Sequence, residues 1–325
     1  MQAKLMKALT VRSGSVSVID VPRPANDAEA LVRVLRSGIC NTDLEIIGGY
    51  AGFEGTIGHE FVGRVENCRN KPELVGRRVV GEINAGCGQC SRCGSGDTRH
   101  CPDRTVLGIK GRDGSHAEYL SLPSENLLEV PDIISDEQAV FIEPLAAAIG
   151  VTERVDIGPD TQVAVIGDGK LGQLCVRALT CVTSNASLVG KHSSKLQLAK
   201  NRGIQTLFFD RCTSVRGSFD VVVEASGAES GFTLAMELVR PRGSIVLKST
   251  FHGRPTWEAW RVVVDEISVV GSRCGRFAPA IKALSDGSVF VDDLISEEFH
   301  LNDAIEALKA AGTPGVMKVL LKLPE

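Results

Sequence analysis

Four cysteines stand close together in one glycine-rich, polar stretch of the chain, at Cys87, Cys90, Cys93 and Cys101. Thiolates this dense in sequence favour a single bound metal ion, and the natural arrangement is tetrahedral zinc with four sulfur ligands. Ordinary free cysteines are the alternative, but these are usually buried singly on apolar faces, and this stretch has no apolar periodicity. Because protein ligands would fill all four positions, we expect this ion to stabilise a loop and to take no part in a reaction.

A second set of possible metal ligands lies on either side of that stretch. Cys40 lies in GICNTD, His59 and Glu60 lie in GHE, and Glu143 opens an expected helix. A cysteine, a histidine and a carboxylate, completed by water, form an open zinc site of the catalytic kind. Each residue taken singly also has a structural interpretation, as a core cysteine, a loop histidine or a charge favoured by the helix dipole.

A glycine-rich turn in the second half of the chain has the spacing of a phosphate-binding loop. Gly167, Gly169 and Gly172 form a GxGxxG pattern, with Lys170 and Leu171 between the last two glycines. The pattern directly follows the apolar run VAVI and opens an amphipathic helix. In that context the glycines permit a tight turn, a close approach of backbone to a pyrophosphate, and close helix–strand packing. We therefore predict dinucleotide binding rather than an ordinary surface loop.

Two regions with different residue patterns must position these residues. The first has short apolar runs separated by glycine and proline, at residues 30–35, 61–66, 77–80 and 117–122, which predict a β-rich domain. Helix formers dominate residues 135–149, and strands and helices then alternate. The expected strands are 162–166, 187–189, 219–223 and 243–247, and the expected helices are 171–179, 194–201 and 232–238. That alternation predicts an α/β fold with a doubly wound parallel sheet.

Composition places the chain among ordinary globular enzymes. Its 325 residues are enough for two domains with hydrophobic cores. Its content of 43% hydrophobic and 23% charged residues is that of a globular protein. A formal net charge of −4 argues against a nucleic-acid partner. No apolar run reaches the length of about 18 residues that crosses a membrane, and the first residues lack a cleavage-site pattern. We expect a cytoplasmic protein whose other cysteines are small buried side chains: Cys68, Cys175, Cys181, Cys212 and Cys274.

Taken together, these features make the chain resemble the zinc-dependent medium-chain dehydrogenase/reductase superfamily over essentially its whole length. The resemblance rests on GICNTD (38–43), GHEFVG (58–63), the four-cysteine stretch, DGSHAEY (113–119), EPLA (143–146), GDGKLG (167–172) and VVVEASG (221–227). It implies a GroES-like catalytic domain at residues 1–148, with a structural zinc lobe at 87–101. It further implies a Rossmann domain at 149–273 and a segment at 274–325 that returns to the catalytic domain.

The resemblance also implies a ligand set for a second, catalytic zinc ion. Cys40 and His59 look like two of its ligands, and Glu143 occupies the place where classical alcohol dehydrogenases carry a third cysteine. A carboxylate there is similar to the polyol, threonine and glucose dehydrogenase branches. Glu60 would be an exchangeable carboxylate, and Asp43 would fix His59 through its other ring nitrogen. Which of Glu60 and Glu143 contacts the resting metal stays open, with Glu143 favoured.

The chemistry implied by the resemblance is oxidation of an alcohol. Zinc stabilises the deprotonated alcohol, and hydride then passes to nicotinamide. Thr42 resembles the hydroxyl that accepts the proton and passes it through the cofactor ribose toward solvent; the alternative is an ordinary strand or turn threonine. Many relatives end this relay with a histidine where the chain has Glu45, so the terminal base is either that carboxylate or bulk water.

The end of the second Rossmann strand bears on the choice of cofactor. An NAD-specific protein carries an acidic residue there for the ribose hydroxyls, whereas this chain has Gly190, followed by Lys191 and His192. We therefore predict that NADP is preferred to NAD; the alternative is a permissive site with Lys191 in solvent. Lys318, near the C-terminus, resembles a basic residue that contacts cofactor phosphates, and a solvated lysine at a strand end is its alternative.

These observations together predict a zinc-dependent, NADP-preferring alcohol dehydrogenase that acts on a small hydroxylated substrate, with polyols and sugars among the candidates. An NADPH-dependent aldehyde reductase and a non-catalytic scaffold of the same fold are the alternatives. The expected partners are a small alcohol or aldehyde, with no nucleic acid and no membrane. Relatives form dimers or tetramers through Rossmann strands, so we expect a homodimer or homotetramer and take the apolar run at residues 267–270 as a candidate interface.

Overall fold

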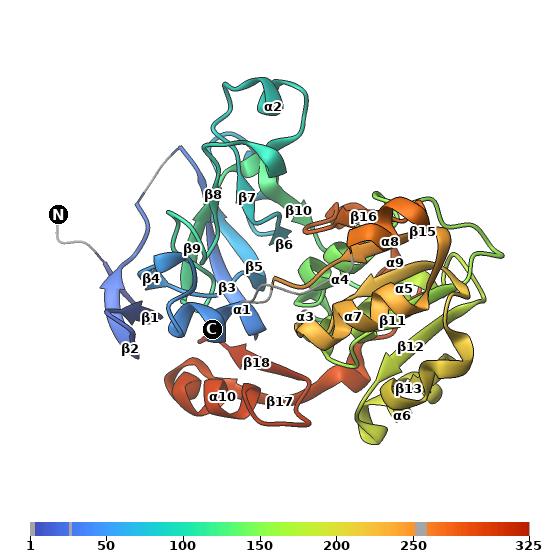
Figure 1. Ribbon diagram of the computed structural model, residues 1–325. Helices are drawn as coiled ribbons and strands as arrows, with labels where there is room; N and C mark the ends of the chain where they lie inside the picture. The colour runs from blue at the N-terminus through green and yellow to red at the C-terminus, as the bar shows by residue number, and fades with distance from the viewer. Residues whose placement is uncertain (1–3, 26–27, 251–258, 325) are drawn as a thin grey trace. The chain divides into compact units, whose positions relative to one another are not determined.

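The computed structural model describes residues 4–25, 28–250 and 259–324, and it divides the chain into two compact units (Figure 1). Unit 1 comprises Met1–Glu143 and Leu294–Glu325, and unit 2 comprises Pro144–Asp293. The chain therefore leaves unit 1 a few residues before the predicted boundary at 148, and returns to it at residue 294 rather than at 274.

The chain returns to unit 1 only at residue 294 because residues 277–293 make contacts within unit 2. Helix α9 (Phe277–Ser285) buries Phe277, and the segment after it is bound to helix α5 (Lys170–Leu179) of unit 2. Arg177 on α5 donates a hydrogen bond of 2.7 Å to the backbone oxygen of Phe290 and pairs with Asp293 at 2.5 Å. These contacts keep the segment with the Rossmann unit.

Unit 1 is built mainly of strands. Its strands are β1 (Leu5–Arg12), β2 (Ser15–Pro22), β3 (Ala30–Ile39), β4 (Gly55–Thr56), β5 (Glu60–Asn67), β6 (Arg78–Gly81), β7 (Asn84–Ala85), β8 (Thr105–Val106), β9 (Tyr119–Leu122), β10 (Leu127–Glu129), β17 (Ile295–His300) and β18 (Lys318–Lys322). Its helices are α1 (Asn41–Ile47), α2 (Ser91–Gly94), α3 (Asp136–Ala139) and α10 (Ala304–Ala311). The stretch at 135–149, where helix formers dominate, forms two helices, α3 and α4 (Ile142–Ile149), and Glu143 lies in the first turn of α4.

The largest sheet of unit 1 has the order β10-β6-β5-β3-β18-β17, with β9 paired to β3. Strand β3 pairs antiparallel with β5, β9 and β18, so it is the element on which the sheet is built. Strand β18, from the C-terminal segment, is buried along almost its whole length. The return of the C-terminal segment thus completes this sheet beside β3.

Unit 2 alternates strands and helices, as the sequence predicts. Its strands are β11 (Val163–Ile166), β12 (Ala186–Gly190), β13 (Gln205–Phe208), β14 (Phe219–Glu224), β15 (Val239–Leu247) and β16 (Ser268–Gly271). Besides α4, α5 and α9, its helices are α6 (Ser193–Lys200), α7 (Glu229–Leu238) and α8 (Ala259–Val264).

In the described part of unit 2, the strands of the sheet are parallel and lie in the order β13-β12-β11-β14-β15-β16. That order is the Rossmann order, in which the first strand of each half lies at the centre and ligands bind beyond the carboxyl ends of the strands. The predicted doubly wound sheet is confirmed. Among the described residues, β16 pairs with β15 alone, so the apolar run at 267–270 lies along an edge of this sheet.

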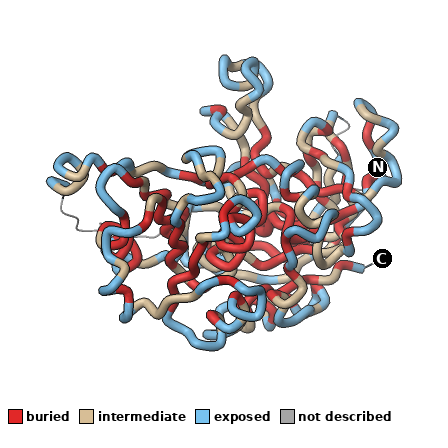
Figure 2. Tube along the Cα trace, turned by 90° about the vertical axis from the view of Figure 1, so that its right-hand side faces the viewer, coloured by how far each residue is buried: buried red, intermediate tan, exposed pale blue. Residues whose placement is uncertain are grey.

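Burial is deepest on strands such as β3, β11 and β12, whereas β2 and β17 are exposed or partly exposed along their length. Figure 2 colours the buried segments red. Strand β11 is buried at every position because the sheet around it is parallel and covered on both faces. Among the cysteines expected to be buried, Cys68, Cys175 and Cys212 are, but Cys181 is exposed and Cys274 is partly exposed. No described helix is long and apolar enough to cross a membrane.

Candidate functional site

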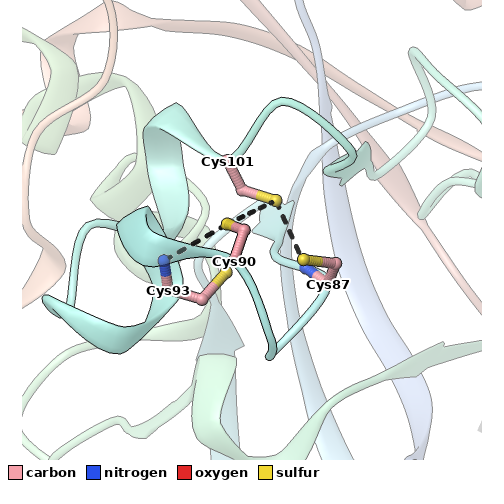
Figure 3. Close-up of side chains that lie close together, drawn as sticks. All are labelled: Cys87, Cys90, Cys93 and Cys101. Carbon is pink, nitrogen blue, oxygen red and sulfur yellow. Dashed lines mark hydrogen bonds between the residues drawn. The ribbon is translucent and has the colours of Figure 1, made fainter.

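The four cysteines of the predicted zinc lobe converge on one point in unit 1, as Figure 3 shows. Cys90 caps α2, Cys93 lies on it, and Cys101 follows a short 3-10 turn at Thr98–His100. The sulfur atoms of Cys90 and Cys101 are 3.7 Å apart, and all four ligand atoms lie within 4.8 Å of one another. Four thiols held this close fit a structural zinc ion.

The thiols of this cluster differ in acidity because their hydrogen bonds differ. Backbone N–H groups of Gln89 and Cys90 lower the pKa of Cys87 to about 7. At Cys93 a backbone hydrogen bond from Gly88 acts in the same direction, but burial and the neighbouring sulfur atoms outweigh it and raise the pKa to about 11. Binding of a metal ion would therefore release protons from this cluster, as it does wherever thiols become thiolate ligands.

A second group of possible metal donors lies elsewhere in unit 1. The ligand atoms of Cys40, His59 and Glu60 lie within 4.8 Å of one another, although the residues belong to separate segments. Cys40 is the N-cap of α1, directly after β3, and Glu60 opens β5, which pairs with β3. The register of these two strands sets Gly38 opposite Glu60 and so brings the two segments together.

The surroundings of His59 fit a metal ligand. Asp43 Oδ1 lies 3.6 Å from His59 Nδ1, and both atoms are buried and have no hydrogen-bond partner in the described part of the chain. Burial lowers the pKa of His59, but the charge of Cys40 and the contact with Asp43 raise it well above its ordinary value. A carboxylate beside one ring nitrogen fixes the ring and leaves the other nitrogen to bind metal.

Asp43 itself is wholly buried and remains a carboxylate. Burial would raise its pKa, but contacts with His116 and His59 hold that pKa far below its ordinary value. Its Oδ2 also accepts a hydrogen bond of 2.8 Å from the backbone N–H of Cys40, so the same carboxylate caps α1. Asp43 therefore ties both expected ligands, Cys40 and His59, to the first turn of α1.

Glu143 and Lys318 have other surroundings in the structure than the sequence led us to expect. Among the described residues, the carboxylate grouped with Cys40 and His59 is that of Glu60, whereas the favoured Glu143 lies outside this group. Lys318 is neither solvated at a strand end nor directed to solvent for a phosphate: it is 1% exposed, and its ammonium pairs with Glu60. Burial lowers the pKa of Lys318, but the charges of Glu60 and Cys40 raise it above its ordinary value.

Thr42 and Glu45, the expected relay residues, lie on successive turns of α1. Thr42 Oγ1 is 3.7 Å from Cys40 Sγ, so its hydroxyl lies beside the donor group. Glu45 Oε1 accepts a hydrogen bond of 2.9 Å from Asn41 Nδ2, while its Oε2 is buried and lacks a hydrogen-bond partner among the described residues. Both side chains are partly buried.

The glycine-rich turn lies between β11 and α5 in unit 2, at the carboxyl end of a central strand. Gly167 has φ +113°, a conformation that favours glycine. A side chain at Gly172 would come within 1.8 Å of the Gly167 carbonyl oxygen, whereas one at Gly169 would meet nothing within 4 Å. Lys170 and Leu171 form the first turn of α5. Open space at Gly169, beside a helix N-terminus, suits a phosphate group.

The end of β12 carries a feature that sequence reasoning missed. Asp168, within the glycine-rich turn, accepts hydrogen bonds of 2.8 Å from the backbone N–H groups of Lys191 and His192, and its carboxylate lies 3.0 Å from His192 Nδ1. It fills the space beside Gly190, where any side chain would come within 2.5 Å of it. The acidic residue inside GDGKLG was the one feature of the sequence that could have indicated this contact.

Lys191 and His192 are both exposed, as a role in binding a phosphate requires. The ammonium of Lys191 lies 4.3 Å from the centre of the Phe209 ring and 3.4 Å from Ser230 Oγ. Asp168 is 6% exposed, so Lys191 and His192 are more accessible to a ligand here than its carboxylate is.

Comparison with known proteins finds that this chain is similar to alcohol and polyol dehydrogenases. Residues 26–132 match the family model of the alcohol dehydrogenase GroES-like domain. D-arabinitol dehydrogenase 1 of Uromyces fabae is 27% identical over 96% of this chain and 94% of its own length.

Two solved structures resemble the whole chain. A zinc-binding dehydrogenase from Sinorhizobium meliloti 1021, bound to NADP, superposes with a TM-score of 0.89 at 27% identity, covering 98% of this chain and 99% of the other. The alcohol dehydrogenase RspB from Escherichia coli CFT073, complexed with NADH, gives a TM-score of 0.90 at 26% identity, with the same coverage.

Proposed function

This chain belongs to the zinc-dependent medium-chain dehydrogenase/reductase superfamily, and we propose that it transfers hydride between an alcohol and a nicotinamide dinucleotide, with NADP as the preferred cofactor. The observation that carries the proposal is the meeting of Cys40, His59 and Glu60 ligand atoms in unit 1, away from the four-cysteine cluster. A cluster of three donors leaves a coordination position for substrate, whereas the four-cysteine cluster leaves none.

The residues around the three donors suit alcohol oxidation. Zinc held by Cys40, His59 and a carboxylate would act as a Lewis acid that lowers the pKa of an alcohol hydroxyl toward neutrality. Asp43 orients His59, and the Thr42 hydroxyl beside Cys40 is the group placed to accept the substrate proton. Glu45, one turn further along α1, is the carboxylate placed to receive it next.

Glu60 and Glu143 have different places in this proposal. Glu60 belongs to the donor group and its Oε2 also pairs with Lys318, so a bound metal ion and the ammonium would share this carboxylate. Glu143 lies close enough to Lys318 to raise the pKa of that residue. We therefore assign one of these two carboxylates as the third ligand and the other as the counter-charge of Lys318.

Cofactor preference rests on the exposed basic side chains beyond β12. Gly190 presents no carboxylate, Asp168 is engaged by backbone N–H groups, and Lys191 and His192 are exposed beside it. A 2′-phosphate there would gain charge-assisted hydrogen bonds. The related S. meliloti structure contains NADP. These features favour NADP, with Gly167, Gly169 and Gly172 receiving the pyrophosphate beside Lys170 and Leu171.

The proposed substrate is a small polyol or sugar. Support comes from the relative named D-arabinitol dehydrogenase and from Glu143 in EPLA, a carboxylate whose place in the sequence resembles the polyol dehydrogenase branch. We further propose a homodimer or homotetramer as the working form, because β16 lies at an edge of the sheet that the described residues form.

Metal analysis of a single variant tests the proposal. Wild-type protein should contain two zinc ions per chain and turn over alcohols or polyols with NADP, read by nicotinamide absorbance. Cys40→Ser should lose one ion and its turnover, while dinucleotide binding and the second ion are retained. Full activity of Cys40→Ser with one ion lost would exclude the catalytic assignment. Wild-type protein that contains a single ion and does not bind dinucleotide would be a scaffold of the same fold, and turnover of aldehydes alone would make it a reductase.

A further inference from the structure

A chain of buried polar side chains leads away from the proposed metal site into unit 1. His116, in the segment before β9, places its Nδ1 2.8 Å from Ser37 Oγ and its Nε2 3.4 Å from Asp43 Oδ2. Ser37, His116 and Asp43 are each 0% exposed, and His59 is 4% exposed. Four polar side chains therefore form a row from β3 to the metal donors without contact with solvent.

The chemistry of the groups fixes the direction of the hydrogen bonds. A carboxylate accepts but does not donate, so the His116 nitrogen that faces Asp43 carries its hydrogen. In a neutral ring the other nitrogen then accepts, and the hydroxyl of Ser37 donates to it. On the far side of Asp43, Oδ1 lies 3.6 Å from His59 Nδ1, which is too far for a hydrogen bond but close enough to turn this nitrogen toward the carboxylate. The other ring nitrogen of His59 is then left for a metal ion, which binds in place of a proton.

The backbone of His116 is held firmly. Its N–H donates to the oxygen of Ile57 at 3.0 Å, and its oxygen accepts from the N–H of Leu9 at 2.8 Å. Its ring lies against Gly58, the residue before His59, where an added side chain would come within 2.6 Å of the ring. Gly58 has φ +98°, so glycine is favoured there on both grounds. His116 thus packs against the segment that carries His59 and also contacts the carboxylate that faces it.

We propose that His116 is a positioning residue of the metal site, which orients Asp43 and, through it, His59. The proposal rests on the proposed metal site at Cys40 and His59. Outer partners of ligating histidines typically contribute a factor of about 10 to 100 in metal affinity. Asp43 has two donors on Oδ2, the N–H of Cys40 and the ring of His116, and loss of the second would free the carboxylate to turn away from His59.

A matched pair of substitutions separates this role from simple packing. Glutamine at position 116 can place an amide N–H near the position of Nε2 and so still reach Asp43. Asparagine, one methylene shorter, places its amide near Nδ1, facing Ser37 but not Asp43. His116→Gln should therefore keep most of the metal affinity at Cys40 and His59, and His116→Asn should weaken it by about 10-fold to 100-fold. His116→Phe fills the volume without any donor and should resemble His116→Asn.

The readout is binding of cobalt and zinc to the full chain, independent of turnover. Cobalt absorption bands report the thiolate and imidazole ligands, and competition with a chromogenic chelator gives the affinity of each site. The four-cysteine site is the internal control and should be unchanged in every variant. Equal affinity and identical cobalt spectra in wild type, His116→Gln and His116→Asn would overturn the proposal. A wild-type protein that binds a single ion would instead overturn the proposed function on which it rests. If His116→Phe does not fold, the comparison of the glutamine and asparagine variants still decides.

Discussion

The ammonium of Lys318 on β18 lies against the carboxylate of Glu60 on β5, although β3 runs between these two strands. Gly38 makes this possible, because it stands opposite Glu60 on one side and Leu320 on the other. A side chain at Gly38 would come within 2.5 Å of Glu60 Oε2 and 3.4 Å of Lys318 Cδ. The pair is 2% and 1% exposed, so each charge depends on the other for its stability in the interior.

Removal of one partner of this pair should destabilise unit 1. Lys318→Met leaves Glu60 as an uncompensated buried charge, which costs about 3 to 5 kcal/mol when a buried pair is broken. The double variant Glu60→Gln with Lys318→Met should recover most of that loss, since it buries no charge. Urea unfolding of the single and double variants, followed by circular dichroism, checks this. A Lys318→Met protein of unchanged stability but weaker dinucleotide binding would restore the phosphate-contact role.

Loss of one structural zinc ligand should lower stability rather than catalysis. Cys93→Ser removes a ligand from the four-cysteine cluster, and structural zinc contributes directly to folding. We expect a lower melting temperature, loss of one zinc ion and a normal kcat per correctly folded molecule. Metal analysis with a thermal melt measures all three, and Cys181→Ser, at an exposed thiol outside both clusters, is the matched control. A Cys93→Ser melt that coincides with that of the control would contradict a structural role for the ion.

The hydroxyl beside Cys40 should matter for proton transfer. Thr42→Val keeps the shape of the side chain and removes the group that lies 3.7 Å from Cys40 Sγ. General acid–base groups contribute about 10²-fold to 10⁴-fold, so kcat should fall by at least about 10²-fold with little change in cofactor binding. Thr42→Ser, which keeps a hydroxyl, should retain most of the activity. Equal kcat values for the valine and serine variants at saturating substrate would mean that the proton bypasses Thr42.

The basic residue beyond β12 should set the preference for NADP. A charge-assisted hydrogen bond contributes about 1.5 to 3 kcal/mol, and screening at this exposed position favours the lower end. Lys191→Ala should therefore reduce kcat/KM for NADP by about 10-fold and leave that for NAD nearly unchanged. Added salt should reduce the difference between the kcat/KM values of the wild-type protein for NADP and for NAD. An acidic substitution at Gly190 is a poor test, because its side chain would collide with Asp168. Equal efficiency with both cofactors at low salt would show a permissive site.

Acid should weaken one partly buried ion pair that lies outside both metal sites. Arg112 holds Glu29 through two hydrogen bonds of 2.7 and 2.8 Å. Burial raises the pKa of Glu29, but Arg112 and Ser121 lower it below the ordinary value of 4.5. A lowered pKa in the folded state stabilises the protein above pH 4.5, and this contribution is lost as the pH falls through the folded-state pKa. Glu29→Gln should lower the free energy of unfolding by about 1 kcal/mol at pH 7. The difference in urea midpoint between wild type and Glu29→Gln should be smaller at pH 4 than at pH 7. A difference that grows toward pH 4 would contradict this sign.

Local chemistry in the sequence determined the four-cysteine cluster and the fold class. The four cysteines lie so close in the chain that a short turn suffices to bring them together, and the roles of Gly167 and Gly172 follow from steric limits at single residues. The alternation of strands and helices likewise predicted the parallel sheet of unit 2, because each element reflects its own hydrophobic period. Such features depend on near neighbours and can be read from a linear pattern.

Tertiary structure alone decided the relations between segments that lie far apart in the chain. The pairing of β18 with β3 turned Lys318 from an expected cofactor contact into the buried partner of Glu60. Strand register at β3 and β5 grouped Glu60 rather than Glu143 with Cys40 and His59, and packing placed His116 against Asp43. Register and packing join residues across long stretches of chain, and a shift of one position reverses which side chains meet. No local pattern in the sequence specifies that shift, so these partners became known only from the folded chain.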